Sequence, residues 1–326
     1  TGTNGKTSTS YLLEGILRQL GRVTGLSSTA ERHLAGEVIV SRLTTPESTE
    51  MHALIARMRE KGVTDIAIEV SAQALTQLRV DGFLFDVAGF TNLTHDHFDD
   101  YDGFEEYLKA KAKLFTKEKA LRGVVCLDTE YGQRIVELSE IPVTTITSKP
   151  DVKADWKVTV TNELPGRTEF TLTDPAGHEL KSSVPLLGAH MALDAGLAIA
   201  MIVTAGYSFQ EIAAKIESGI QAYLPGRTEL VSPDNAPNVY VDFGHSPDAF
   251  AKTLAAVRKV TKGKVLMLFG ADGDRDERGR RRTGRHAHGR DSRHRNRRAS
   301  LPAQRRRDSG RQLRARARAR RIRHPR

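Results

Sequence analysis

The stretch TGTNGKTSTS, residues 1–10, decides how the rest of the sequence is interpreted. Its pattern Gly-x-x-Gly-Lys-Thr, from Gly2 to Thr7, is typical of a loop that binds phosphate. In such a loop the backbone N–H groups and the N-terminus of the following helix face the anion. Lys6 would neutralise phosphate charge, the Thr7 hydroxyl would bind Mg²⁺, and Gly2 and Gly5 would let the backbone approach the oxygens closely. The alternative is an ordinary glycine turn that caps a helix.

Alternating helix and strand patterns follow this loop. Residues 8–20 and 49–62 have the apolar spacing of helices, and the apolar runs 63–71 and 85–93 predict buried strands that end in polar residues. This alternation predicts an α/β fold with a mostly parallel sheet. Ligands of such sheets collect beyond the carboxyl ends of the strands, so Glu69 falls where a site is expected.

The second half of the sequence predicts an insertion and a further α/β unit. Residues 156–185 alternate apolar and polar around Gly and Pro turns, which indicates a small antiparallel insertion. A Pro-Gly turn at 225–226 marks a domain boundary near residue 222. Helices are expected in 186–206, 208–220 and 249–260, and strands in 238–250 and 264–276.

Length and composition limit the classes of protein that are possible. The 326 residues, 39% of them hydrophobic, suffice for two or three domains. No apolar stretch approaches the roughly 20 residues of a membrane helix, and no signal peptide is recognisable, so we expect a cytoplasmic protein without membrane insertion. The single cysteine, Cys126, excludes an intrachain disulfide and a cysteine-cluster metal site, and we interpret it as a small buried hydrophobe.

The net charge of +10 is an average over two unlike segments. Residues 277–326 hold 21 Arg, no Lys and three acidic residues, a net charge of +18, which leaves −8 for residues 1–276. The tail has too few large apolar residues for a core, so it is expected to be disordered. An Arg-rich tail can bind nucleic acid by counterion release. Because Lys is absent, we favour a GC-rich gene read in the wrong frame and expect no nucleic-acid partner.

Three further positions carry possible chemistry. Glu69 follows an apolar run, where a buried carboxylate is costly without a cation, so it predicts a metal contact; the alternative is a surface Glu at a strand end. The segment THDHFDDY, residues 94–101, includes His97 and favours metal or phosphate contact over a solvated loop. In the helix predicted over 104–115, composition alone does not distinguish Lys111 from the neighbouring lysines.

Eight ordered segments resemble the Mur ligase family, in particular its tripeptide synthetases, which add the third residue of the peptidoglycan stem peptide. Beside the phosphate loop, the similar segments are TTPES (44–48), EVSAQALTQLRV (69–80), TNLTHDHFDDY (91–101), YLKAKAKLF (107–115), LPGRTE (224–229), VDFGHSPDA (241–249) and FGADGDRD (269–276). The resemblance implies a Mur ligase central domain over 1–222, lacking its first strand, the start of a Rossmann-like C-terminal domain over 223–276, and the tail 277–326.

The resemblance also implies roles for single residues. Thr7 and Glu69 would hold a first Mg²⁺, and His97 would help to hold a second near Lys111, which is expected to be carbamylated. Lys6, Glu69, His97 and Lys111 would be the catalytic residues. The residues expected to bind ATP are Gly2, Thr3, Asn4, Gly5, Lys6, Thr7, Ser8, His190, Asp194, Arg227, Asp242 and His245. Those expected to bind the muramoyl dipeptide are Thr44, Thr45, Ser71, Gln77 and Arg79.

One segment departs from the family pattern. Where the family has Asn at two positions that contact adenine, this chain has Met191 and Asp194, which puts the adenine contacts in question.

The activity implied is ATP-dependent ligation. ATP would phosphorylate the D-Glu carboxylate of UDP-N-acetylmuramoyl-L-Ala-D-Glu, and the amine of a free diamino acid would attack the acyl phosphate. We expect a monomer whose activity is weak or absent, because the loop at Thr1 has no preceding strand and the C-terminal domain is incomplete. The alternatives are another member of the superfamily, such as a folylpolyglutamate synthase, and a nucleic-acid-binding protein acting through the tail.

Overall fold

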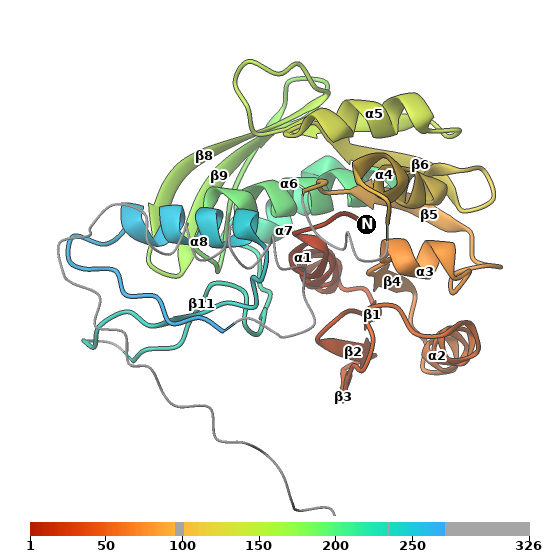
Figure 1. Cartoon of the computed structure of the whole chain (residues 1–326), viewed down its shortest axis with the longest axis horizontal. Coiled ribbons are helices and arrows are strands. Elements are labelled where there is room, and N and C mark those ends of the chain that lie inside the picture. The colour runs from red at the N-terminus through yellow and green to blue at the C-terminus, as the bar shows by residue number, and fades with distance from the viewer. Residues whose placement is uncertain (95–100, 234, 271–326) are drawn as a thin grey trace, which may run out of the picture. The chain divides into compact units, whose positions relative to one another are not determined.

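The computed structural model describes residues 1–94, 101–233 and 235–270 (Figure 1). His97 and the Arg-rich segment 277–326 therefore lie outside the described residues. None of the helices within the described ranges is long and apolar enough to cross a membrane.

The first α/β unit confirms the expected alternation. Helix α1 (Lys6–Gln19) follows the phosphate loop, and Gly5 takes its N-cap position with a φ of 85°, a left-handed conformation that favours glycine. A four-stranded sheet has the order β3-β2-β1-β4, in which only β1 and β4 are parallel. Its strands are β1 (Thr24–Ser27), β2 (Glu31–Leu34), β3 (Glu37–Val40) and β4 (Asp65–Ile68).

A six-stranded sheet has the order β10-β9-β8-β7-β6-β5. Strands β5 (Phe85–Phe90), β6 (Ala120–Cys126), β7 (Val143–Thr147) and β8 (Trp156–Leu164) run parallel, whereas β9 (Arg167–Thr173) and β10 (Glu179–Val184) continue as antiparallel hairpins. The antiparallel insertion expected over 156–185 is thus confirmed, and both sheets are mixed.

Helices cover both faces of this layer. Helix α1, α6 (Ala189–Thr204) and α7 (Phe209–Ile216) share one apolar core with β6 to β10, which includes Leu12, Val124 and Ala198. On the other face, a second core contains Met51, Phe90 and Phe115, and is formed largely by helices α2 to α5. These are α2 (Ser48–Glu60), α3 (Ala72–Thr76), α4 (Phe104–Ala112, followed by a 3-10 turn at Lys113–Phe115) and α5 (Glu130–Leu138). Cys126 is buried, and desolvation raises the pKa of its thiol to about 12, as expected for a small buried hydrophobe.

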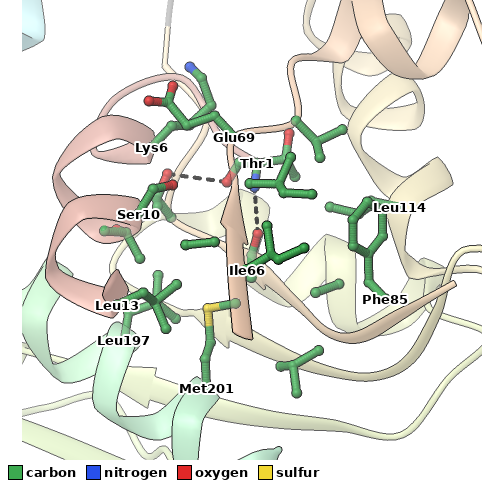
Figure 2. A pocket seen from close by; sticks show the side chains of 18 residues that line it. Thr1, Lys6, Ser10, Leu13, Ile66, Glu69, Phe85, Leu114, Leu197 and Met201 are labelled. Atoms are coloured by element: carbon green, nitrogen blue, oxygen red, sulfur yellow. Dashed lines mark hydrogen bonds between the residues drawn. The ribbon is translucent and has the colours of Figure 1, made fainter. Parts of the chain in front are cut away.

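A slot of about 80 Å³ lies between the two sheets (Figure 2). Strand β4 is the last strand of one sheet and β5 the last strand of the other, and residues of both line the slot. Thr1 lies in the slot, where its N donates to Gly89 O at 2.7 Å and its O accepts from Thr91 N at 3.0 Å. This is the bond pattern of a residue paired in parallel with Phe90 of β5. The edges of β4 and β5 thus face each other across a space that the described residues do not fill.

In the part of the C-terminal unit that the structure describes, as far as residue 270, one expected strand does not form. It contains β11 (Glu229–Leu230), β12 (Tyr240–Val241) and α8 (Pro247–Lys259), so the expected helix is confirmed. The prediction of a strand from residue 264 is wrong for residues 264–270, the last of this unit that the structure describes. These residues form no strand, and Leu266 and Leu268 are 91% and 101% exposed. An apolar segment pairs as a strand only where a neighbouring strand offers backbone partners, and no described strand does so here.

Candidate nucleotide and substrate site

The phosphate loop is anchored to the end of β5. The backbone N of Thr3 donates to Asn92 O at 2.9 Å, and the backbone N of Asn4 donates to Asn92 Oδ1 at 3.0 Å. The Lys6 ammonium donates to the carbonyls of Gly2 and Thr3 at 3.1 and 3.0 Å. Lys6 is thus folded back over its own loop, where a phosphate could take over its hydrogen bonds.

A cavity of about 300 Å³ opens at this loop. Its walls come from the loop, the start of α6, Arg227, the segment after β12 and the first turns of α8. Nearly all residues expected to bind ATP line it: Thr3, Asn4, Gly5, Lys6, Thr7, Ser8, His190, Asp194, Arg227, Asp242 and His245. Gly2 does not line this cavity. The fold therefore brings together residues that are more than 200 positions apart in the sequence.

Two ionisable groups of α6 lie in this cavity wall, the buried Asp194 and the half-buried His190. Desolvation raises the pKa of Asp194 to about 8 and lowers the pKa of His190 to about 4. The Asp194 carboxyl lies against the loop: a Cβ added at Gly5 would meet Asp194 Oδ1 at 2.6 Å. Around neutral pH, therefore, both side chains are uncharged, and Asp194 has a proton to donate as an amide would.

Arg227 joins the C-terminal unit to the loop. Its guanidinium donates to Thr7 Oγ1 at 2.8 Å and lies 5.0 Å from the centre of the Phe243 ring. Burial lowers its pKa, although nearby acidic groups oppose this shift. Asp242 accepts from Thr228 N at 2.9 Å, which fixes the turn that carries Arg227. The hydroxyl expected to bind Mg²⁺ is therefore in contact with a cation of the opposite wall.

Glu69 is 1% exposed and follows β4, as expected for a strand end at the site. Its carboxylate accepts from Thr29 N at 3.0 Å and from Thr29 Oγ1 at 2.9 Å. Carboxylate and hydroxyl oxygens are donors that suit Mg²⁺, so Glu69 and Thr7 fit such an ion by type. Among the described residues, no group of three or more His, Cys, Asp or Glu is placed to hold a metal without further ligands.

Lys111 is the buried lysine of α4, with 1% of its surface exposed. Its Nζ donates to Gly2 O at 2.9 Å and lies 4.1 Å from the centre of the Tyr107 ring. Helical spacing alone cannot single out this residue from its neighbours. In the structure Lys111 is buried against the phosphate loop, whereas Lys109 is exposed and pairs loosely with Glu105 at 3.9 Å.

Four of the five residues expected to bind the dipeptide cluster beside Glu69. Thr45 Oγ1 donates to Glu69 O at 2.9 Å and accepts from Ser71 N at 3.1 Å, and Arg79 donates to Thr45 O at 3.1 Å. Thr44 Oγ1 accepts from Thr29 at 3.0 Å. The fifth residue, Gln77, is the exposed C-cap of α3, where its backbone N donates to Gln73 O at 2.8 Å.

Three residues of the site were not foreseen. Thr29 binds both Glu69 and Thr44, and Lys252 and Thr253 of α8 line the nucleotide cavity. Thr29 lies in a polar turn after β1, the kind of strand end where a site is expected, so its position was a usable signal. Lys252 and Thr253 carry no such signal, because helical residues reach this cavity only through the packing of α8.

Two family models match the chain. The model of the Mur ligase middle domain matches residues 1–202, and that of the Mur ligase glutamate ligase domain matches residues 226–321. Among solved structures, one of a UDP-N-acetylmuramoyl-L-alanyl-D-glutamate–2,6-diaminopimelate ligase superposes with a TM-score of 0.66 at 25% identity, covering 88% of this chain and 58% of that one. A folylpolyglutamate synthase of Mycobacterium tuberculosis complexed with ADP superposes with 0.60 at 19% identity, covering 79% and 64%, which shows a shared fold.

Sequence relatives agree with the family models. The UDP-N-acetylmuramyl-tripeptide synthetase of Leifsonia xyli is 59% identical over 85% of this chain and 54% of that protein. The UDP-N-acetylmuramoyl-L-alanyl-D-glutamate–2,6-diaminopimelate ligase of Streptomyces avermitilis is 41% identical over the same shares. The chain thus spans about half the length of the curated relatives that it matches. With the phosphate loop, the buried Lys111 and the Arg227 contact in place, these matches show that the chain belongs to the Mur ligase family.

Proposed function

We propose that this chain carries the nucleotide-binding part of an ATP-dependent ligase that joins a diamino acid to UDP-N-acetylmuramoyl-L-Ala-D-Glu in peptidoglycan synthesis. The observation that carries the proposal is the cavity at the phosphate loop, into which residues from both units converge. The 59% identity to a UDP-N-acetylmuramyl-tripeptide synthetase supports the choice of substrate.

In the proposed reaction, the residues of the chain bind, orient and neutralise. The backbone N–H groups of the loop and Lys6 hold the ATP phosphates, and Lys6 neutralises charge on the phosphoryl group in transfer. Arg227 leaves Thr7 and turns to the phosphates when nucleotide enters. His190, Asp194, Asp242 and His245 contact the rest of the nucleotide.

Mg²⁺, when bound, would draw negative charge from the phosphate oxygens and so ease transfer to the D-Glu carboxylate. We propose that Thr7 and Glu69 would hold a first Mg²⁺, and that His97 would help to hold a second near carbamylated Lys111. Thr44, Thr45, Ser71, Gln77 and Arg79 would hold the muramoyl dipeptide beside Glu69, so that its carboxylate faces the phosphates. A cytoplasmic location and a monomeric state follow as part of the same proposal.

We further propose the domain boundaries 1–222 for the central domain and 223–276 for the C-terminal unit, with 277–326 as a separate segment. The slot between β4 and β5 supports the idea that one further strand completes the central sheet, because both edges face it.

A chimera tests the proposed function. Residues 1–270 replace the matching part of the Leifsonia xyli relative, and ADP release and the nucleotide-linked product are measured with lysine, diaminopimelate or ornithine as the amino acid. We expect ligation with UDP-N-acetylmuramoyl-L-Ala-D-Glu and none with a folate substrate. If the parent enzyme is active and a folded chimera is not, or if the chimera extends folate instead, the proposal is wrong.

Lys111 should carry one carboxyl group derived from carbon dioxide. Its amine is buried and donates to the Gly2 carbonyl of the phosphate loop, which supports a carbamate at this position near the proposed metal. Mass spectrometry of the intact chain under bicarbonate should show the mass of one added CO₂, which Lys111→Arg abolishes. The variant Lys109→Arg is the matched control, because this exposed lysine of the same helix should leave the adduct in place.

Replacing Asp194 by Asn should stabilise the chain at high pH. The pKa of Asp194 is raised by burial to about 8, so its contribution to stability is full at acid pH and is lost as pH rises through about 8. Asn keeps the shape and never ionises. We therefore expect the Tm of Asp194→Asn to exceed that of the wild type at pH 9 and to differ less at pH 5. An equal Tm difference at both pH values would contradict the assignment.

A further inference from the structure

The side chain of Asn4 joins two elements that are far apart in the sequence. Its Nδ2 donates to Thr94 Oγ1 at 3.2 Å and to Asp248 Oδ2 at 3.1 Å, and its Oδ1 accepts from Ser246 Oγ at 3.4 Å. Ser246 is the N-cap of α8 and accepts from Ala249 N at 3.2 Å. Asn4 therefore fastens the beginning of α8 to the phosphate loop, and its amide points to protein groups.

The backbone of Asn4 is held as firmly as its side chain. Its O accepts from Thr91 Oγ1 at 2.6 Å and from Asn92 Nδ2 at 3.1 Å, and its N donates to Asn92 Oδ1 at 3.0 Å. With both backbone groups bound to the segment after β5, the loop offers α8 a fixed point of attachment.

A second contact holds the other end of α8. Lys259 Nζ donates to Glu163 Oε2 of β8 at 2.6 Å. Asp248 and Lys259 are 11 residues apart, three helical turns, so they lie on one face about 16 Å from each other. Lys252, on the same face, pairs with Asp248 at 2.9 Å and lines the nucleotide cavity. The position of α8 therefore sets one wall of that cavity.

We propose that Asn4 and Asp248 form a latch that positions α8 over the nucleotide cavity. In this assignment the side chain of Asn4 is a positioning group that binds protein groups and not the phosphates. The inference rests on the proposed function because the cavity is taken to bind ATP.

A double-mutant cycle tests the latch on the full chain, with Mg-ATP as the probe. Asn4→Ala and Asp248→Ala should each lower the affinity by about 3- to 10-fold, as expected for the loss of one hydrogen bond of about 0.7–1.4 kcal/mol. The double variant should bind about as well as Asp248→Ala alone, because both variants remove the Asn4–Asp248 contact and Asp248→Ala also breaks the ion pair with Lys252. Asp248→Asn should restore most of the affinity, since its amide oxygen still accepts from Asn4.

Two controls separate this inference from the proposed function. Arg134→Ala removes the exposed ion pair with Glu105, at 3.3 Å, and should leave the affinity unchanged. If the wild-type chain does not bind Mg-ATP, the proposed function fails, and hydrogen exchange of α8 without nucleotide then tests the latch: Asn4→Ala should speed exchange in its first turns. The latch is wrong if the two losses of affinity multiply in the double variant, or if neither Asn4→Ala nor Asp248→Ala changes affinity or exchange.

Discussion

Replacing Lys6 by alanine should lower the affinity for Mg-ATP by about 30- to 150-fold, which corresponds to the 2–3 kcal/mol of a hydrogen bond between charged groups. The Lys6 ammonium already lies over the loop, within 3.1 Å of two carbonyls that a phosphate would replace as its partners. Its removal leaves the phosphate charge facing only backbone dipoles and Arg227. Isothermal titration of the full chain measures the loss directly.

The affinity must be compared with stability, because the same ammonium also ties the loop together. We expect the Tm of Lys6→Ala without nucleotide to change little, since the loop keeps its bonds to Asn92. Lys109→Ala is the matched control: it removes a lysine from an exposed helical position and should leave the affinity unaltered. An affinity for Lys6→Ala within threefold of the wild type would contradict the assignment of this loop to phosphate.

Local sequence patterns were sufficient to predict several of the helices and strands in the first 220 residues. The helix after Gly5, the strand before Glu69 and the hairpins from residue 156 follow from apolar period and turn residues alone. The expectation that Glu69 is buried at a strand end is confirmed for the same reason, because a parallel strand places its carboxyl end at the ligand-binding edge.

Tertiary packing decided what local patterns could not. The lysines of α4 look alike in sequence, and only the packing of that helix against the phosphate loop separates Lys111 from Lys109. The contact of Arg227 with Thr7 spans 220 residues, so no local signal could predict it. The apolar run from residue 264 has the composition of a strand, but strand formation depends on a neighbouring edge, and Leu268 stays exposed.

Filling the slot between β4 and β5 should raise the stability of the chain more than any single substitution. A six-residue apolar extension placed ahead of Thr1, rich in Val and Ile, would continue the parallel pairing that Thr1 makes with β5. The buried Val and Ile side chains leave water, and the backbone of the extension gains hydrogen-bond partners on two strand edges. We expect the Tm to rise by about 5 °C or more, measured by circular dichroism.

A Gly-Ser extension of equal length is the matched control, because it adds the same number of residues but no apolar side chains that could fill the slot. We expect the Tm of the chain with the apolar extension to exceed that of the Gly-Ser chain by about 5 °C or more. Equal Tm values for the two extensions would show that the slot does not accept a strand.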